Sequence, residues 1–232
     1  MKKTLLILSL FVATCAKAQT TFGINGSIIG ANMTSKSDDP DEDFGDFKTR
    51  LSWSLGVTAR VPLSERFVFL PQLNLLSKGG KFDETTTEDI GGGQMVTFQV
   101  KGDAKLNYLE LPLNFVYQSN KFFIGAGPSV SYGLGGDFDG RVTYTFMGQT
   151  ESESFSANVK FDGKKSEDTD DEAVHLKALE FGANFITGYT LNNGIAINAK
   201  YNHGLSNIDP NEGSESKNRY FGLGVIYFFS RK

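Results

Sequence analysis

Eight stretches of this chain alternate apolar and polar residues, and short turns and long loops connect them in turn. In the clearest stretch, residues 50–62, every second residue from Leu51 to Val61 is apolar, and the residues from Arg50 to Arg60 between them are polar or glycine. Successive strand side chains point to opposite faces, so such a segment has one apolar and one polar side. Because lipid cannot hydrogen-bond to a backbone, only helices and closed barrels span membranes. Strands with one apolar face therefore predict a membrane-spanning barrel.

The predicted fold is all-β, an eight-stranded antiparallel up-and-down transmembrane β-barrel formed by residues 19–232. Each predicted strand is long enough to cross a membrane at the usual tilt, which takes roughly 9–11 residues. The strands are expected at about 21–33, 50–62, 66–78, 105–117, 122–134, 176–191, 195–205 and 218–229.

The connections between these strands fall into two kinds. Three are tight, at 62–65, 118–121 and 192–194, and the last contains the Asn-Gly pair that favours hairpins. Four are long, at about 34–49, 79–104, 135–175 and 206–217. Short periplasmic turns and long outer loops are typical of bacterial outer-membrane barrels, and an even strand number places both termini in the periplasm.

Residues 1–18 have the features of a cleaved secretory signal peptide. Lys2 and Lys3 precede a short apolar core, Thr4 to Thr14, and Ala16-Lys17-Ala18 forms a cleavage site that leaves Gln19 first. The alternative is a lipoprotein anchored through Cys15, although Thr14 fits poorly before a lipidated cysteine.

The composition of the mature chain limits its class. The single cysteine leaves with the signal peptide, and an exported protein without disulfides suits a bacterial envelope. Removing the three leader lysines leaves 20 basic against 27 acidic residues, so the net charge changes from −4 to −7 and nucleic acid is not an expected partner. No later apolar run approaches the roughly 18 residues of a transmembrane helix.

Six charged residues fall on the predicted lumen face: Arg50, Arg60, Lys78, Glu110, Glu180 and Lys200. Among them, Arg60, Glu110, Glu180 and Lys200 are predicted to form a structural charge network, because an eight-stranded barrel is nearly filled by its own side chains and buried charges are tolerated when paired. A proton or ion path, or a gate, is the alternative function for these residues.

Two acidic runs lie in the long loops, at 38–46 and 167–172. Clustered carboxylates can bind Ca²⁺ or Mg²⁺, but the spacing of an EF-hand is absent. We expect solvated acidic loops, with a weak divalent-cation site near lipopolysaccharide as the alternative.

Some small outer-membrane barrels modify lipid A with a surface serine and histidine. Here His203 lies near Ser206, and the last strand brings Arg219 close, but no G-x-S-x-G elbow exists. The other mature histidine, His175, ends the third long loop. The sequence therefore predicts no enzyme activity and no catalytic, cofactor or metal site.

The long loops contain further alternation at 94–101, 141–147 and 153–161. The third loop is too long to be a plain connection. We expect strands two to six to extend beyond the membrane as hairpins whose edges and aromatic side chains form the contact surface.

Four motifs together resemble the outer-membrane β-barrel family abundant in Bacteroidetes and sometimes called PorT-like. They are Phe67–Lys81, Leu106–Leu113 (LNYLELPL), Phe123–Pro128 (FIGAGP), and Tyr201–Leu205 (YNHGL) with Ile208, Asn218 and Arg219. The resemblance implies an eight-stranded barrel in the outer membrane, and its namesake takes part in protein secretion and gliding. The motifs carry no catalytic residues to transfer.

The sequence thus predicts a monomeric outer-membrane barrel with a structural or interaction role. Its outer loops would contact partner proteins or lipopolysaccharide, and outer-membrane lipid would surround it. Three alternatives stay open: a component of a PorT-like secretion or gliding apparatus, a narrow channel or small-ligand-binding barrel, and a lipid-modifying enzyme, which would need a nucleophile that the sequence does not reveal.

Overall fold

The structure is a computed structural model that describes residues 20–37, 47–89, 91–92, 94–165 and 172–229. The predicted signal peptide, the acidic run at 38–46 and most of the run at 167–172 lie outside these residues. Ten strands are present in the described part, and none of its segments is a helix long and apolar enough to cross a membrane. The strands are β1 (Thr21–Ser37), β2 (Arg50–Pro62), β3 (Phe67–Asp89), β4 (Met95–Ser119), β5 (Phe122–Phe146), β6 (Gln149–Lys160), β7 (Val174–His175), β8 (Leu179–Thr190), β9 (Ile195–Gly204) and β10 (Ser214–Phe228).

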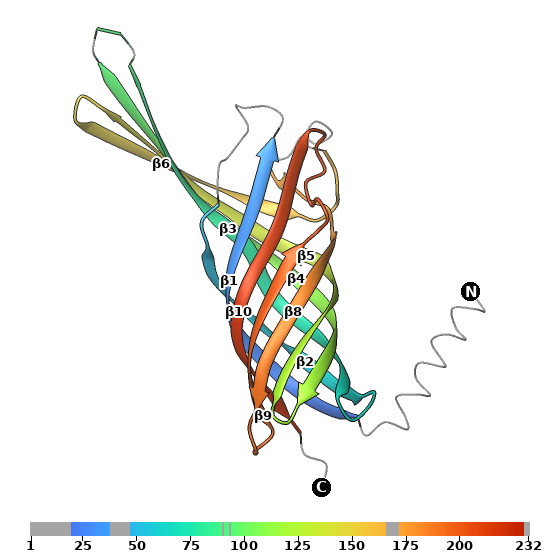
Figure 1. Cartoon of the computed structure of the whole chain (residues 1–232). Helices are drawn as coiled ribbons and strands as arrows, with labels where there is room; N and C mark the ends of the chain where they lie inside the picture. Colours follow the sequence, from blue (N-terminus) through green and yellow to red (C-terminus); the bar gives the residue numbers. More distant parts are fainter. Residues whose placement is uncertain (1–19, 38–46, 90, 93, 166–171, 230–232) are drawn as a thin grey trace.

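Eight of these strands close into a barrel (Figure 1). Hydrogen-bonded neighbours run β4-β3-β2-β1-β10-β9-β8-β5, and pairing of β4 with β5 completes the ring. All pairs around the ring are antiparallel, as expected for strands that follow one another up and down. The start of β1 and the end of β10 lie at the same end of the barrel as the three tight turns, because Gly23 is in register with Phe228. The prediction of an eight-stranded up-and-down barrel is confirmed.

The two faces of the barrel wall differ as the alternation predicts. Apolar side chains such as Leu55, Phe185 and Leu223 point outward and are about half exposed. The inward side chains form three layers. Near the tight turns lies an apolar layer that includes Val68, Leu70, Val116, Phe123, Ile186, Ala196 and Ile226. A second apolar layer near the long loops includes Ile29, Leu76, Leu106, Tyr108, Leu176, Ile208 and Tyr220. Between them the interior is polar, with buried asparagines, serines and charged residues.

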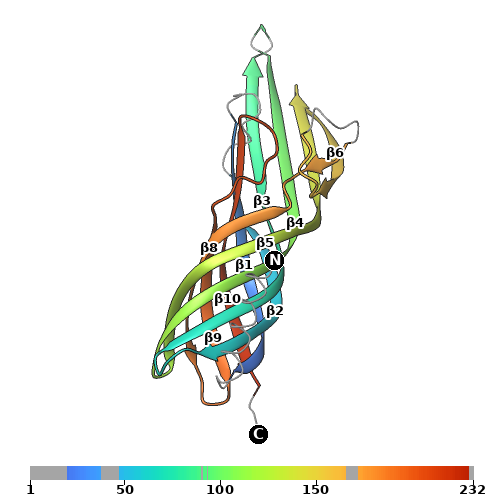
Figure 2. The same cartoon turned by 90° about the vertical axis from the view of Figure 1, so that its right-hand side faces the viewer.

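Strands β3, β4 and β5 continue far beyond the ring and, together with β6, form a four-stranded sheet that we call the extension (Figures 1 and 2). It comprises residues 79–89, 95–107, 135–146 and 149–160. The prediction of strands that extend as hairpins is therefore confirmed for the third to fifth barrel strands. It is wrong for the second and sixth, since β2 and β8 start at Arg50 and Leu179.

Local contacts explain why β2 and β8 stay short. Before β2, the carbonyl of Phe47 accepts a hydrogen bond from Asn32 at 2.6 Å, and Phe47 turns inward. Before β8, Val174 and Leu176 pack over the barrel mouth, where Leu176 is buried. Both segments cover the apolar layer at this end, so neither is available to lengthen a strand.

A β-bulge joins the barrel to the extension. The register between β4 and β5 shifts at Asn107 and Tyr108, which pair with Gly135 and Gly133 and leave Leu134 without an opposite residue. One extra residue reverses the side-chain alternation of a strand above it. Odd-numbered residues of β5 such as Ser131 point inward below the bulge, and even-numbered residues such as Phe138 do so above it. Gly135 has a φ of 148°, which favours glycine at this position.

Candidate functional site

Three charged groups meet in the barrel interior. The ammonium of Lys78 lies 3.0 Å from Glu110 and 3.1 Å from Glu180, and all three side chains are buried. Ser131 accepts a hydrogen bond from Lys78 at 2.9 Å, Tyr220 donates to Glu110 at 2.6 Å, and Asn218 donates to Glu180 at 2.9 Å. Neighbouring hydroxyl and amide groups thus complete the ion-pair cluster, which is the condition for tolerating buried charge.

The other predicted network residues lie elsewhere. Among the described residues Lys200 has no carboxylate within ion-pair distance; it donates to Ser54 at 3.1 Å and lies over the ring of Tyr220. Arg60 is near the tight turns, where it donates to Gln118 and faces the ring of Phe228. Of the four predicted residues, only Glu110 and Glu180 therefore share a partner, and that partner is Lys78. Sequence reasoning placed Lys78 at a strand end because it did not foresee how far β3 extends.

This cluster joins three strands of the barrel wall through their side chains. One ammonium lies between two carboxylates, so hydrogen bonds from Tyr220 and Asn218 help to stabilise the excess negative charge, and apolar layers lie above and below the cluster. Lys78 comes from β3, Glu110 from the neighbouring β4, and Glu180 from β8, which is separated from β4 by β5 alone.

The residues considered for catalysis do not assemble. His203 points to the outside, where its ring nitrogen lies 3.2 Å from the hydroxyl of Tyr201. Arg219 is in register with His203, but its guanidinium donates to Asn32 at 3.3 Å. Ser206 accepts a backbone hydrogen bond from Phe181 at 2.8 Å. These three side chains are held by separate partners.

The second histidine helps to cover the barrel mouth. His175 is buried and its Nδ1 atom lies 2.8 Å from Asp162, joining the segment after β6 to β7. This hydrogen bond, with smaller help from Lys164, lowers the pKa of Asp162. Among the described residues no group of three His, Cys, Asp or Glu side chains is placed to hold a metal ion.

The face of the extension that continues the barrel lumen is apolar. Neighbouring aromatic rings cross its base: Phe47 lies 5.9 Å from Phe82, Phe82 stacks on Phe138 at 5.7 Å, and Phe138 lies 6.1 Å from Phe155. Glycines make room for this row, because a Cβ atom at Gly102 would overlap the ring of Phe82. We call this surface the apolar face; in the upper part of the extension it includes Val96, Phe98, Val100, Val142, Tyr144 and Phe146.

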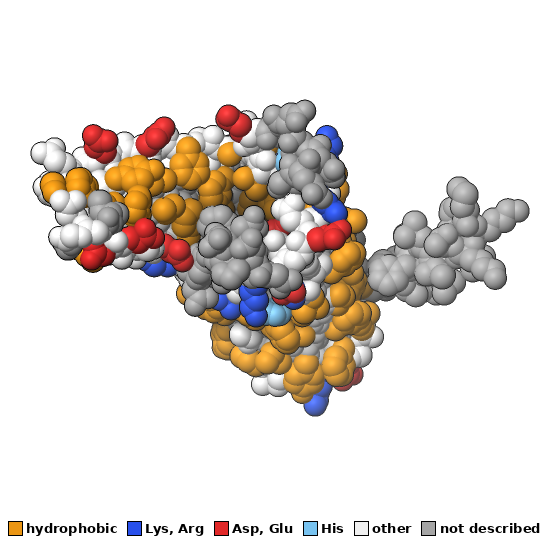
Figure 3. Space-filling view, turned by 90° about the horizontal axis from the view of Figure 1, so that it is seen from above, with side chains coloured by type: hydrophobic (Ala, Val, Ile, Leu, Met, Phe, Trp, Pro, Cys, Tyr) orange, Lys and Arg blue, Asp and Glu red, His pale blue; other side chains and the backbone are white. Residues whose placement is uncertain are grey.

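Acidic residues line both sides of the apolar face. Strand register places Glu84, Val100, Val142 and Glu153 in one row across the four strands. Glu88 on β3 and Glu151 on β6 point to the same face as this row. All lysines and arginines of the extension point to the opposite face. Figure 3 shows the hydrophobic side chains gathered over the extension, with acidic side chains on both sides. The apolar face thus has four carboxylates at its margins and no cation.

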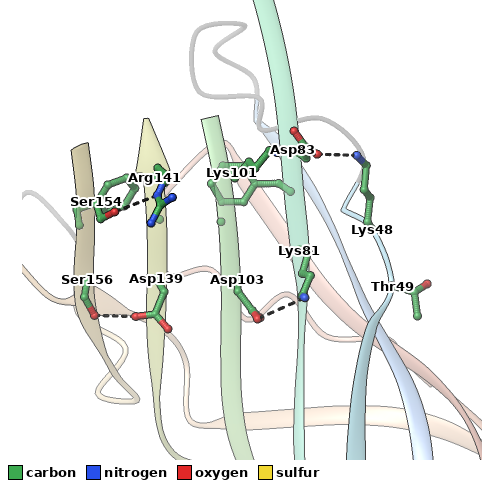
Figure 4. Close-up of a pocket in the computed structure, with 14 residues that line it drawn as sticks. Lys48, Thr49, Lys81, Asp83, Lys101, Asp103, Asp139, Arg141, Ser154 and Ser156 are labelled. Atoms are coloured by element: carbon green, nitrogen blue, oxygen red, sulfur yellow. Dashed lines mark hydrogen bonds and ion pairs between the residues drawn. The ribbon is translucent and has the colours of Figure 1, made fainter. Parts of the chain in front are cut away.

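The opposite face of the extension, which we call the polar face, carries both cations and carboxylates, and several of them form ion pairs (Figure 4). The next row there is Asp83, Lys101, Arg141 and Ser154. Lys48 lies 3.3 Å from Asp83. Arg141 donates to Ser154 at 3.1 Å. These residues line a shallow depression of about 730 Å³.

Lower on the polar face, Lys105 lies 2.8 Å from Asp139. Hydrogen bonds from Lys105 and Ser156 lower the pKa of Asp139. The polar face therefore carries cations that pair with several of its carboxylates, in contrast with the apolar face.

A smaller apolar cavity of about 220 Å³ lies where the extension meets the barrel mouth. Phe47, Phe82, Leu106, Phe138 and Leu176 are among its lining residues. The apolar face therefore runs without interruption from the barrel mouth onto the extension. The sequence predicts a contact surface made by extended hairpins. It does not predict that one face of the extension is apolar, because this depends on which strands pair.

These features define a class of protein: a closed barrel with a lipid-facing outer wall, a filled interior and a sheet that projects from one end. The chain belongs to the outer membrane protein beta-barrel domain family, whose model matches residues 17–209. The protein is thus a bacterial outer-membrane β-barrel protein.

Two solved structures are similar to the chain at low sequence identity. Ail, the attachment invasion locus protein of Yersinia pestis, is 14% identical with a TM-score of 0.41, covering 90% of this chain and 99% of that chain. The Neisserial surface protein A is 9% identical with a TM-score of 0.39, covering 90% and 97%. No curated protein matches the chain.

Proposed function

We propose that this protein is a monomeric, non-enzymatic interaction protein of the outer membrane that binds a partner through the apolar face of its extension. In this proposal the signal peptide exports the chain, the tight turns and termini lie in the periplasm, and the extension projects outside the cell. The observation that carries the proposal is the reversal of polarity along the strands. Above the barrel, β3 and β4 turn their apolar side chains away from the lipid-facing wall and leave them without a covering element among the described residues.

Site-specific photo-crosslinking in living cells tests this proposal. A photoreactive phenylalanine analogue replaces Tyr144 or Phe155, both about two-fifths exposed on the apolar face. Matched control positions are Lys101 and Ser152, which are exposed on the polar face of neighbouring strands. We expect light-dependent adducts of discrete mass from the apolar-face positions only. Equal adducts from both faces, or none from the apolar face, would contradict the proposal.

Two of the alternatives predict different results. A component of a PorT-like secretion or gliding apparatus would yield crosslinks to export machinery, and its deletion would retain cargo in the periplasm; the PorT-like motifs support this finer assignment. A narrow channel would conduct in planar bilayers. We expect no steady conductance, because apolar layers close the interior on both sides of the charged cluster.

Lipopolysaccharide contact is a second role, assigned to the polar face. This face continues the lipid-facing wall of the barrel, and it places Lys48, Lys81, Lys101 and Arg141 directly above the apolar outer surface. Such cations are at the level where lipid phosphates would meet the protein. Neutralising Lys81 and Lys101 together should weaken co-purification of lipopolysaccharide while leaving crosslinks from Tyr144 unchanged.

A further inference from the structure

The margins of the apolar face restrict what can cover it. Of the residues that point to this side in the extension, Glu84, Glu88, Glu151 and Glu153 are charged, and all four are acidic. Among the described residues none of these carboxylates has a basic group within ion-pair distance, whereas Asp83, Asp103 and Asp139 on the polar face all do. Asp89 and Asp137 on the polar face also lack a basic group within ion-pair distance among the described residues. The apolar face differs in that its only charged side chains are carboxylates, whereas the polar face carries lysines and an arginine as well.

The spacing of the acidic rows matches the width of a helix. Glu84 and Glu153 stand on the two outer strands, with Val100 and Val142 between them in register. Strands lie about 4.8 Å apart, so three intervals place the two rows about 14 Å from each other. A helix with its side chains is about 10–12 Å wide, so a helix lying along β4 and β5 would fill this width.

The length of the apolar face also matches that of a helix. From Val96 to Ala104, β4 spans eight residue steps, which is about 26 Å at the rise of a strand. A helix of about 17 residues has that length. A single strand added to the edge of β6 or β3 would leave the middle of the face uncovered.

We propose that the apolar face binds an amphipathic helix of a partner protein that has apolar residues on one side and lysine or arginine on both flanks. This inference rests on the proposed function and adds the chemistry of the partner. Basic flanks would meet the glutamates of β3 and β6, and the apolar side would cover Phe98, Val100 and Val142.

Other occupants fit the charges less well. A second copy of this chain would bring its own four unpaired glutamates against the first set, which like-charge repulsion opposes. Membrane lipid beside the barrel meets the polar face, because that face continues the lipid-facing wall.

Binding of model helices to the whole protein in nanodiscs of zwitterionic lipid tests the inference. The probe is a fluorescein-labelled 18-residue helix with leucines on one side and lysines on both flanks. The control probe has glutamates in place of the lysines, and empty nanodiscs give the background. By fluorescence anisotropy we expect the lysine helix to bind at least tenfold more tightly than the glutamate helix. Its binding should weaken as salt is raised, because exposed charges are screened.

Two variants with equal loss of acidic charge complete the test. Glu84→Gln/Glu153→Gln removes one carboxylate from each margin and should weaken binding of the lysine helix about tenfold. Asp89→Asn/Asp137→Asn removes two carboxylates from the polar side and should change it less than twofold. Folding of both variants is checked by the mobility of unheated samples in SDS gels.

The outcomes separate this inference from the proposed function. Equal binding of both helices, or equal effects of both double variants, would overturn the inference. If neither helix binds while crosslinks from Tyr144 persist, the partner has another chemistry: the inference fails and the proposed function stands. If neither helix binds and no crosslinks form, both fail.

Discussion

Strand β4 has two halves of similar length whose faces are reversed. In the barrel, Leu109 and Leu111 point outward and Glu110 points inward, where it is buried. In the extension, Gln99, Lys101 and Asp103 point to the same side as Leu109 and Leu111. Phe98, Val100 and Ala104 point to the same side as Glu110. The backbone alternation of β4 does not change, so only the order of residue types differs between the halves.

The difference shows what each half is built to meet. A barrel in lipid exposes apolar side chains outward and gathers polar groups inside. A sheet in water instead exposes polar side chains on one face. Its other, apolar face requires a covering element, since a large exposed apolar surface marks an interaction site. The change between Asp103 and Leu109 therefore marks the edge of the lipid-facing wall. The apolar face above it is the surface that we propose a partner covers.

The largest expected difference between the two halves concerns their lysines. Lys78→Met leaves Glu110 and Glu180 buried without a cation and should reduce the free energy of unfolding by about 3–5 kcal/mol. Lys101→Met removes a lysine whose side chain is 53% exposed and 4.0 Å from Asp83, and should cost about 0–1 kcal/mol. Urea titration of refolded protein, followed by the gel mobility of unheated samples, measures both changes.

A compensating variant gives the control for this prediction. Adding Glu110→Gln and Glu180→Gln to Lys78→Met removes the unpaired charges and should restore much of the loss. If the triple variant is as unstable as Lys78→Met alone, the loss of stability comes from altered packing of the side chains and not from unpaired charge.

The second difference concerns the outward faces. Leu55→Arg places a charge in the lipid-facing wall, at 59% exposure, and should cost about 2–4 kcal/mol near mid-depth. Ser152→Arg places the same side chain on the polar face of the extension and should change stability by about 0.5 kcal/mol or less. Folding yield into lipid vesicles and urea midpoints check both, and similar costs at the two positions would mean that the lipid boundary is misplaced.

The sequence was sufficient to predict what local patterns determine. The bounds of β2 at Arg50 and Pro62, the tight turns and the closed ring all follow from alternation and turn residues. Alternation in the long loops also predicted that β3 to β5 extend. How far each of them extends, and the role of Lys78, depend on pairing between strands, which alternation alone does not specify. Likewise, the bulge at Leu134 decides which residues of β5 join the apolar face. The inward apolar layer near the tight turns was missed because runs such as Phe67–Leu70 are apolar on both sides.

A smaller effect should be confined to the extension. Gly102→Ala adds a Cβ atom that would overlap the ring of Phe82 and disturb the aromatic row. We expect a loss of about 1–3 kcal/mol, the usual cost of overpacking, seen as faster hydrogen exchange of amides at 82–104. Gln99→Ala, on the polar face of the same strand, is the control. Faster exchange throughout the barrel wall would show that the two halves fold as one unit.

The smallest expected effect concerns the segment between β6 and β8, where Asp162 contacts the buried ring of His175. Because this contact lowers the pKa of Asp162, its contribution to stability is present above the ordinary value of about 4 and is lost as the pH falls through the lower folded value. We expect hydrogen exchange at 172–176, corrected for the intrinsic effect of pH, to quicken between pH 5 and pH 3, while amides of β2 stay protected. In Asp162→Asn this segment should exchange rapidly already at pH 6 and respond little to acid. An unchanged pH response in that variant would mean that another group holds the cover of the barrel mouth in place.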